Sequence, residues 1–487
     1  MKEVNMSILQ CEPKQVLNFF EQISQIPRGS GNEQAISDYL VSFGKERGLT
    51  VKQDEALNVV IYKPGSPGRE NAPALVLQSH MDMVCEKNAD TAHDFLTDPI
   101  KLRVEDDFLF ASGTTLGADN GVGVAISLAV LDSNDIVHPP LEVIFTSEEE
   151  TTMKGIAALD PEWIKARRMI NMDSGNDTTF CVGCAGGGRV DFTVPITREP
   201  LPSGMVCSVL TVRGLLGGHS GGEIHLGKAN SIRTLGRALS DLKKQKIDFR
   251  IVKVSGGLKA NAIPRESDAI IALNSEDVGK ANQVISNLQT TLRLEYKIPD
   301  PGITLALLPT QKYSEAFTTD SAKKVINAML LLPFGVLHMS YDIPGLVETS
   351  NNVGVMETTP EGVSMDLALR SSVPTRRLSV CAQIEALAES IGAKATFAHG
   401  YPSWTYNPDS PLLASAIAKY VEMYQTNPCV EAVHSGLECG FMMEKIPGMD
   451  ILSYCCKIYD AHTPNEHLSI SSLERVWKYT QALLESL

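Results

Sequence analysis

ALVLQSH, residues 74–80, is a short apolar run that ends in His80. LEVIFTSEEE, residues 141–150, has the same design and ends in three glutamates. In RRMINMDSG, residues 167–175, Asp173 follows the apolar part of the run. A later run, ILSYCCKIYDAH at residues 451–462, again places polar residues after apolar ones. Apolar runs of this length are typical of strands buried on both faces of a sheet. We therefore expect strands that end in acids and imidazoles.

Segments with helical periodicity alternate with these runs. Residues 15–26 and 33–47 place apolar side chains on one face, and residues 121–133 form an apolar, helix-like stretch. The sequence Gly117-Ala118-Asp119-Asn120-Gly121 opens that stretch, and its glycines let the backbone approach a ligand closely. Alternation of strands and helices predicts an α/β fold, with a mixed sheet and helices on both faces. Ligands of such sheets bind beyond the carboxyl ends of the strands, so the polar tips should share one rim.

The middle of the chain has a different pattern. Residues 187–397 contain alternating, strand-like segments separated by helix-like pieces at 229–244 and 280–292. We do not find acid-tipped runs there. This indicates an inserted α+β domain, with residues 1–186 and 398–487 as the two parts of the main α/β domain.

The insert shows a weak internal similarity. Asn261-Ala262-Ile263-Pro264 followed by DAIIAL resembles Asn351-Asn352-Val353-Gly354 followed by VSMDLALR. Two similar halves are one interpretation. Chance similarity in strand composition is the other.

Composition excludes several classes of protein. The 487 residues are 43% hydrophobic, enough for a sizeable core, and the formal net charge is −15. An acidic chain repels phosphate backbones and anionic lipids, so we expect neither nucleic acid nor membrane as a partner. Residues 1–15 lack the pattern of a secretory signal, and apolar stretches long enough to cross a bilayer are missing. A cytoplasmic protein with reduced cysteines is expected.

The polar tips contain residue types that bind divalent cations. His80 and Asp82 are two apart on extended backbone and should point the same way, as a metal-binding imidazole and its supporting carboxylate do. Asp119 offers two oxygens that can bridge two cations. A structurally satisfied histidine and a helix-capping aspartate are the ordinary alternatives for these residues.

Three adjacent glutamates and a late histidine extend this set. Glu148, Glu149 and Glu150 repel one another unless cations or hydrogen bonds compensate, although acids are also common at a solvated helix N-terminus. Asp173 and His462 complete a mixed nitrogen and oxygen ligand set, which suits zinc, manganese or cobalt. His467 is a further candidate imidazole near His462, but lies farther from the apolar run.

Two other motifs are incomplete. Gly222-x4-Gly227-Lys228 approaches a phosphate-binding loop, but Ala229 stands where serine or threonine is needed. Ser220 and Ser435 each neighbour a histidine, but the Gly-x-Ser-x-Gly elbow of serine hydrolases is absent. Nucleotide binding and serine catalysis are therefore poorly supported.

The motifs HMD, GADNG, SEEE, NMDSG and YDAH, in this order, resemble those of the co-catalytic zinc metallopeptidases. That family includes aminoacylases, carboxypeptidase G-type enzymes and desuccinylases. The resemblance covers nearly the whole chain and implies a catalytic domain, a lid domain and two divalent metal ions per chain. It makes the insert the lid.

The resemblance assigns roles to the residues of the main domain. It makes His80 a metal ligand, Asp82 a residue that supports catalysis, and Asp119 the ligand that bridges both metals. It also implies a cis peptide bond between Asp119 and Asn120. The resemblance further implies that Asp173 binds the same metal as His80.

The glutamate register follows from the same resemblance. Relatives place a glycine five residues after the ligand glutamate, and Gly155 fits Glu150 in this way. Glu149 is then the general base and Glu150 a metal ligand together with His462. Glu148 is left as an outer acid.

Three residues of the insert, and Gly436 beyond it, match the family's substrate-contacting positions. His219 in GGHSGG corresponds to the lid histidine that stabilises the oxyanion. Asn261 and Arg370 correspond to residues that bind polar and carboxylate groups of the substrate, and Gly436 to a backbone contact. A surface arginine at a strand end is the plain alternative for Arg370.

The implied activity is hydrolysis of dipeptides with broad specificity, including dipeptides with a C-terminal histidine. Glu149 would activate a metal-bridging water, and zinc is the expected metal, with manganese or cobalt as alternatives. Two other functions remain open: a deacylase or desuccinylase of N-acylated amino acids, and a non-catalytic metal-binding protein. A homodimer is also left open.

Overall fold

The computed structural model describes residues 8–398 and 400–487, which fall into two compact units. Unit 1 comprises Met1–Gly183, Trp404–Ala432 and Leu437–Leu487. Unit 2 comprises Cys184–Ser403 and the short return Val433–Gly436. Residues 1–7, which belong to the start expected to lack a signal, lie outside the described residues.

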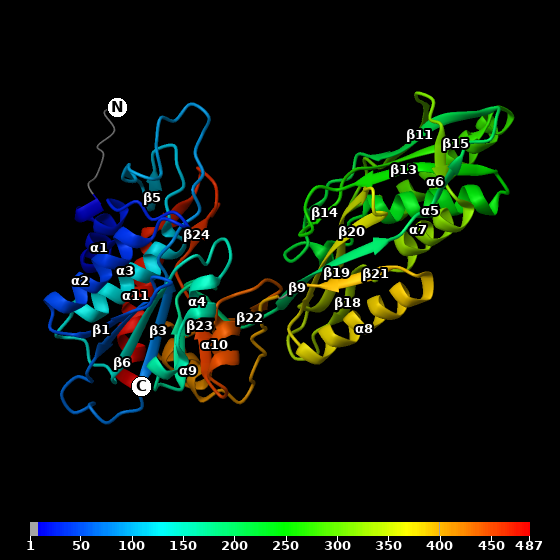
Figure 1. The fold of residues 1–487 in the computed structure, drawn as a ribbon. Helices are drawn as coiled ribbons and strands as arrows, with labels where there is room; N and C mark the ends of the chain where they lie inside the picture. Colours follow the sequence, from blue (N-terminus) through cyan, green and yellow to red (C-terminus); the bar gives the residue numbers. More distant parts are fainter. Residues whose placement is uncertain (1–7, 399) are drawn as a thin grey trace. The chain divides into compact units, whose positions relative to one another are not determined.

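Unit 1 is built on a mixed sheet of eight strands (Figure 1). In spatial order the strands are β1 (Thr50–Gln53), β2 (Val59–Lys63), β6 (Leu141–Thr146), β3 (Leu75–His80), β7 (Arg168–Asn171), β23 (Asp450–Ser453), β8 (Thr179–Cys184) and β22 (Cys429–Val433). The four central strands, from β6 to β23, run parallel. The predicted α/β class with a mixed sheet is confirmed.

Helices pack against this sheet. Those of unit 1 are α1 (Lys14–Ser24), α2 (Gln34–Glu46), α3 (Ala118–Asp132), α4 (Lys154–Ala158), α9 (Pro411–Tyr424), α10 (Cys439–Lys445) and α11 (Ile470–Ser486). The apolar helix α3 lies between α1 and strand β3, which explains why nearly all of its side chains are buried. The expected helices at 15–26, 33–47 and 121–133 are confirmed to within a few residues.

The parallel strands bring their carboxyl ends to one edge. His80, the last residue of β3, pairs in register with Thr146, the last residue of β6. Gln78 pairs with Asn171 at the end of β7. The strand formed by the apolar run at 451–462 is shorter than that run, since β23 ends at Ser453. Beyond it, β24 (Ile458–Tyr459) and β25 (His467–Ser469) join β4 (Leu102–Glu105) and β5 (Phe108–Ala111) in a small separate sheet.

Unit 2 contains one nine-stranded sheet (Figure 1). Its path is β16 (Thr304–Pro309), β11 (Met205–Arg213), β15 (Ser267–Asn274), β13 (Phe249–Gly256), β19 (Val347–Thr358), β20 (Val363–Ser371), β9 (Gly186–Val194) and β21 (Lys394–Phe397), with β18 (Gly335–Met339) beside β19. Its helices are α5 (Ser231–Lys244), α6 (Val278–Glu295), α7 (Thr319–Leu331) and α8 (Pro374–Ile391). Two short pairs complete it: β10 (Arg198–Pro200) with β17 (Glu315–Phe317), and β12 (Gly218–His219) with β14 (Ala262–Ile263).

The sheet of unit 2 divides into two parts of identical topology. One part runs β11-α5-β13-β15-α6-β16 along the chain and the other β9-α7-β19-β20-α8-β21, with the first inserted into the second. In each, the strands lie in the spatial order fourth, first, third, second, and β13 meets β19 where the parts join. The compared segments DAIIAL and VSMDLALR lie in the third strand of each part. Asn261-Ala262 and Asn351-Asn352 do not correspond, because Asn351 and Asn352 lie inside β19.

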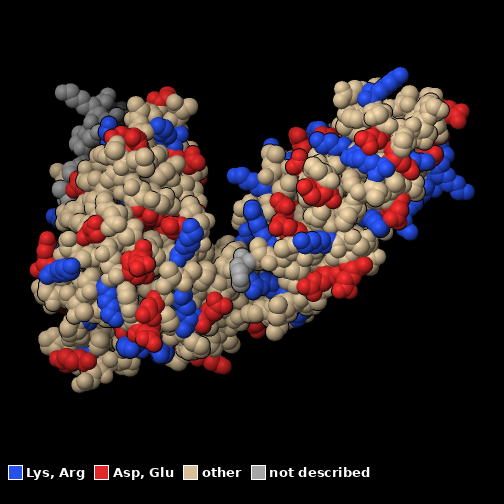
Figure 2. Space-filling model, in the orientation of Figure 1, with Lys and Arg blue, Asp and Glu red and all other residues tan. Residues whose placement is uncertain are grey.

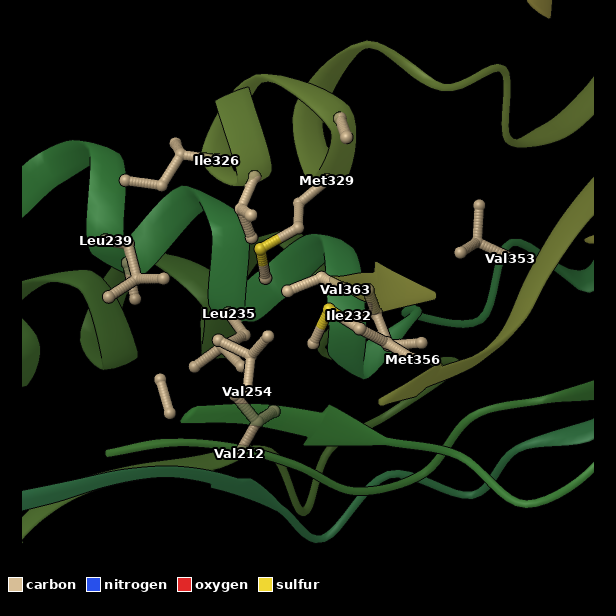
Figure 3. Close-up of a cluster of buried hydrophobic side chains, with 14 of the residues drawn as sticks. Val212, Ile232, Leu235, Leu239, Val254, Ile326, Met329, Val353, Met356 and Val363 are labelled. Atoms are coloured by element: carbon tan, nitrogen blue, oxygen red, sulfur yellow. The ribbon is translucent and has the colours of Figure 1, made fainter. Parts of the chain in front are cut away.

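Helix α5 shows how the apolar pattern builds the core of unit 2. The Asn230 side chain accepts a hydrogen bond from the Arg233 N–H at 3.1 Å and so caps its first turn. Ile232, Leu235 and Leu239 recur at helical spacing and are buried. Figure 3 shows these side chains packed with residues of α7 and of the neighbouring strands.

On the face shown in Figure 2, acidic and basic side chains are interspersed over both units. Among the described residues, each helix is too short or too polar to span a bilayer.

Candidate metal centre and anion-binding cluster

Asp119 stands between two groups of possible metal ligands in unit 1. Its Oδ1 lies 3.3 Å from His80 Nε2, which is also 3.3 Å from Asp173 Oδ1. Its Oδ2 lies 3.2 Å from His462 Nε2, which is 3.1 Å from Glu150 Oε1. The five residues expected as ligands from five remote segments therefore meet at one place. The two oxygens of Asp119 face different groups, as a bridging carboxylate requires.

Asp82 anchors the neighbourhood of His80. It is fully buried, and its Oδ1 lies 3.3 Å from His80 Nδ1, the ring nitrogen turned away from Asp119. The same carboxylate accepts hydrogen bonds from the Ser30 hydroxyl at 2.7 Å and from the N–H groups of Glu149 and Glu150 at 3.1 and 3.2 Å. Asp82 thus fixes both an imidazole and the glutamate loop, which is the role of a carboxylate behind a metal ligand.

The three glutamates point to different places. Glu150 belongs to the group with Asp119 and His462, and Glu149 to a group with His80 and Glu150. The Glu148 carboxylate instead accepts a hydrogen bond from Thr152 at 2.8 Å and lies 3.6 Å from Lys154 Nζ. This arrangement matches the register in which Glu148 is outside the site.

The two histidines are held close to their acidic neighbours. Burial disfavours the charged form of His80, but Asp173 and Asp119 raise its pKa well above the usual value. Hydrogen bonds with Asp119 and Glu150 raise the pKa of His462 to about 10. Both shifts show a site whose negative potential attracts a positive charge.

The carboxylates show the corresponding crowding. Burial raises the pKa of Glu149 well above its usual value, and the nearby acids Asp173 and Glu438 raise it further. Burial alone would raise the pKa of Asp119, but hydrogen bonds with the two histidines hold it below its usual value. Cations between these oxygens would relieve this repulsion.

Glu438 is a buried acid near this site that the sequence interpretation missed. Its Oε2 accepts hydrogen bonds from Gln78 Nε2 at 2.5 Å and from Thr146 Oγ1 at 2.7 Å, and Gln78 in turn accepts one from Asn171 at 2.5 Å. Burial raises the Glu438 pKa to about 8. A lone glutamate among the small and apolar residues of GLECGF was the available signal.

The turn that carries Asp119 has the expected cis bond to Asn120. Its glycines have a different role from the one expected. A Cβ at Gly117 would lie 2.6 Å from Arg28 Nη2, and one at Gly121 would lie 2.5 Å from the same atom. The glycines therefore make room for a buried guanidinium rather than for a ligand.

The alternative imidazole, His467, belongs to none of the possible metal-ligand groups among the described residues. Its ring stacks on Phe110 and Tyr459, and its Nδ1 lies 2.8 Å from the Asn465 carbonyl oxygen. His467 therefore packs with aromatic side chains in the small sheet.

Unit 2 contains a cluster of the opposite character around Arg370. This arginine is only 8% exposed, lies in β20, and donates a hydrogen bond from Nη1 to the Tyr401 hydroxyl at 2.7 Å. Its Nε has no hydrogen-bond partner among the described residues. The alternative of a surface arginine is thus wrong. A buried guanidinium with unused donors suits a carboxylate.

Two histidines lie beside Arg370. Burial and the Arg370 charge lower the pKa of His219. His434, whose Nε2 lies 2.7 Å from the Ser350 hydroxyl, has its pKa lowered to about 3 by the same two causes. Gly221 permits this approach, because a Cβ there would lie 2.9 Å from His219 Cε1 and 3.2 Å from Arg370 Cζ.

Asn261 and Gly436 belong to unit 2 as well. The Asn261 side chain is exposed, and the Asn352 amide braces its turn by donating to the carbonyl oxygens of Ala260 and Ala262, both at 2.8 Å. Gly436 lies against the Tyr401 ring, where a Cβ would come within 2.5 Å of Cε2. All four residues expected to contact substrate thus lie in unit 2.

The sequence profile described as peptidase family M20/M25/M40 matches residues 76–486. The chain belongs to this family. The match spans both units, as did the resemblance in the order of motifs.

Two proteins at least 36% identical to this chain support this membership, and a more distant structure shares its fold. A cytosol non-specific dipeptidase of Escherichia coli (strain K12) is 36% identical over 480 residues, 98% of each chain. The solved structure of aminoacylhistidine dipeptidase from Vibrio alginolyticus is 37% identical, covers 100% of this chain and 99% of its own, and has a TM-score of 0.93. A tripeptidase structure from Staphylococcus aureus shares the fold at 18% identity, 98% coverage of both chains and a TM-score of 0.56.

The donor set of this M20/M25/M40 chain fits divalent cations. His80, Asp119 and Asp173 offer ligand atoms within 4.8 Å of one another, as do Asp119, Glu150 and His462. Imidazole nitrogen mixed with carboxylate oxygen is the set that zinc and its neighbours bind.

Proposed function

We propose that the chain is a two-metal dipeptidase with broad specificity, including dipeptides with a C-terminal histidine. The observation that carries the proposal is Asp119, whose two oxygens face two separate histidine–carboxylate groups. The names of the two relatives with at least 36% identity over almost the full chain support dipeptides as substrates.

Zinc is the metal we propose, with manganese or cobalt as alternatives. His80 and Asp173 would hold one ion, Glu150 and His462 the other, and Asp119 both. When bound, the ions supply Lewis-acid chemistry that activates a water and polarises the scissile carbonyl. Asp82 keeps the His80 ring oriented for this purpose.

Glu149 is the proposed general base. It is the one of the three glutamates that lies beside His80 without a hydrogen bond to His462. Its carboxylate takes a proton from the attacking water and gives it to the leaving amine. The water oxygen bonds to the carbonyl carbon, the C–N bond breaks, and two amino acids are released from a dipeptide.

Unit 2 is proposed to serve as the substrate-binding lid. Arg370 would bind the free C-terminal carboxylate of the dipeptide through paired hydrogen bonds. His219 would donate a hydrogen bond to the oxyanion of the transition state, and Asn261 and the Gly436 backbone would contact polar groups of the substrate. A homodimer and a cytoplasmic location remain predictions.

The test combines elemental analysis of the purified chain with a substrate panel. The panel contains dipeptides with and without C-terminal histidine, a tripeptide and N-acetyl amino acids. We expect two equivalents of metal and hydrolysis of the dipeptides.

Other outcomes identify the competing functions. Hydrolysis of N-acetyl or N-succinyl amino acids alone would indicate a deacylase or desuccinylase. Two bound metals with no hydrolysis of any panel member would indicate a metal-binding protein without catalysis.

A further inference from the structure

The loop that carries Asp119 is held by a buried carboxylate from the far end of the chain. Glu466 is 2% exposed and accepts four backbone hydrogen bonds. Its Oε2 accepts from the N–H groups of Leu116 and Gly117 at 2.9 and 3.1 Å. Its Oε1 accepts from those of Ala118 and Asp119 at 2.8 and 3.2 Å. One side chain thus satisfies four consecutive amides, the last being that of Asp119 itself.

Arg28 holds the same turn from its carbonyl side. This buried arginine donates from Nη2 to the Gly117 carbonyl oxygen at 2.6 Å, and from Nη1 to the carbonyl oxygens of Met81 and Asp82 at 3.1 and 3.3 Å. It therefore ties the turn of Asp119 to the segment that follows His80. Glycine at 117, with φ +69°, leaves the space that the guanidinium occupies.

We propose that Glu466 and Arg28 are positioning residues that fix Asp119 so that its two carboxylate oxygens face the two metal groups. The inference rests on the proposed metal centre. Its physical reason is that the side-chain hydrogen bonds of Asp119 go only to His80 and His462 among the described residues, both of which are ligands themselves. The backbone of Asp119 must therefore be fixed independently of the metal ligands. The Glu466 carboxylate does this by accepting a hydrogen bond from the Asp119 N–H.

Glu142 offers a matched control. It is also a buried glutamate of unit 1, 6% exposed, and its carboxylate accepts backbone hydrogen bonds from Lys165 at 3.0 Å and Ala166 at 3.1 Å. It lies at the start of β6, whereas the metal groups lie at and beyond the carboxyl ends of the strands. Removing its charge should disturb folding stability without disturbing Asp119.

The experiment compares Glu466→Gln with Glu142→Gln in the full chain after removal of bound metal. A Gln at 466 puts an NH2 group where two N–H donors need an acceptor, so at least two of the four hydrogen bonds are lost. Two readouts are used: hydrogen exchange of a peptide spanning residues 112–121 without metal, and titration with Co²⁺ followed by its visible absorption. Neither depends on turnover.

We expect faster exchange at 112–121 in Glu466→Gln, a change in the Co²⁺ spectrum, and roughly a 10- to 100-fold loss of Co²⁺ affinity. Glu142→Gln should change none of the three. Arg28→Lys keeps the charge but loses the paired donors of the guanidinium, so it should show the same changes more weakly. It replaces Glu466→Gln in the experiment if that variant does not fold.

The inference is overturned if exchange at 112–121 or the Co²⁺ affinity and spectrum of Glu466→Gln match those of the unaltered chain. It is also overturned if Glu142→Gln shows equal changes, because the effect would then be one of general stability. A different result tests the proposed function: an unaltered chain that fails to bind two Co²⁺ ions has no such metal centre, whatever the variants do.

Discussion

Each unit contains a histidine beside charged side chains, but the charges are of opposite sign. In unit 1, His462 lies among carboxylates, which raise its pKa to about 10. In unit 2, His434 is buried beside Arg370, and its pKa is lowered to about 3. One unit therefore offers a site of negative potential that suits cations, and the other a site of positive potential that suits an anion. In the proposed function, the metal ions are bound in unit 1 and the substrate carboxylate is bound in unit 2.

The largest predicted effect is on the site of unit 1, at Glu149. Glu149→Gln keeps the shape of the side chain but removes the proton acceptor, so turnover of a dipeptide should fall by roughly 10²- to 10⁴-fold. Metal content should stay the same, since the two histidine–carboxylate groups are intact. Glu148→Gln is the control, because that side chain faces Thr152. Full activity of Glu149→Gln would disprove its role as base.

A smaller effect is expected from the anion site of unit 2. Arg370→Met removes a charged hydrogen bond worth about 1.5–3 kcal/mol, so kcat/KM should fall by roughly 10- to 100-fold while metal affinity is unchanged. The sharper measurement compares a dipeptide with its C-terminal amide. The unaltered chain should prefer the free carboxylate, and the variant should lose that preference. An undiminished preference would show that the carboxylate binds elsewhere.

The Tyr401 hydroxyl should contribute less, because it acts on the substrate only through Arg370. Tyr401→Phe deletes the 2.7 Å hydrogen bond that Arg370 Nη1 donates to the hydroxyl, and should lower kcat/KM about fivefold, chiefly by raising KM, as expected for about 1 kcal/mol. The matched control is Tyr479→Phe, which deletes a 2.8 Å hydrogen bond from a buried phenol to the Ala416 carbonyl oxygen within unit 1. Equal kinetic changes in both variants would mean that Tyr401 has only a packing role.

Much of unit 1 could be predicted because each part of it is local in the sequence. An apolar run predicts a buried strand, and the parallel strands must deliver whatever follows them to one edge. His80 and the glutamates could be placed in this way without any knowledge of tertiary contacts. The family's spacing between the ligand glutamate and a later glycine, matched by Glu150 and Gly155, added the predicted register of Glu149 and Glu150.

The supporting residues could not be predicted, because their function depends on contacts between distant segments. Arg28 follows an ordinary amphipathic helix, and nothing near it in sequence shows that it reaches Gly117. Glu466 was visible in YDAHTPNEH, but its four amide partners are about 350 residues away. His434 and Tyr401 likewise meet Arg370 only through the fold of unit 2.

The last predicted effect concerns the pH dependence of stability at His434. In the unfolded chain this histidine gains a proton below pH about 6.5, whereas in the folded chain it stays neutral until pH about 3. Folded and unfolded states are equally protonated above pH 6.5, and the unfolded state binds more protons between the two values. His434 therefore costs stability as the pH falls through this window.

His434→Gln cannot take up that proton, so its melting temperature should fall less than that of the unaltered chain between pH 7.5 and 5. Ser350→Ala, which removes only the 2.7 Å hydrogen-bond partner, should keep the steeper dependence. Parallel curves for His434→Gln and the unaltered chain would show that acid acts elsewhere, and the contrast between the histidines of the two units would lose its energetic basis.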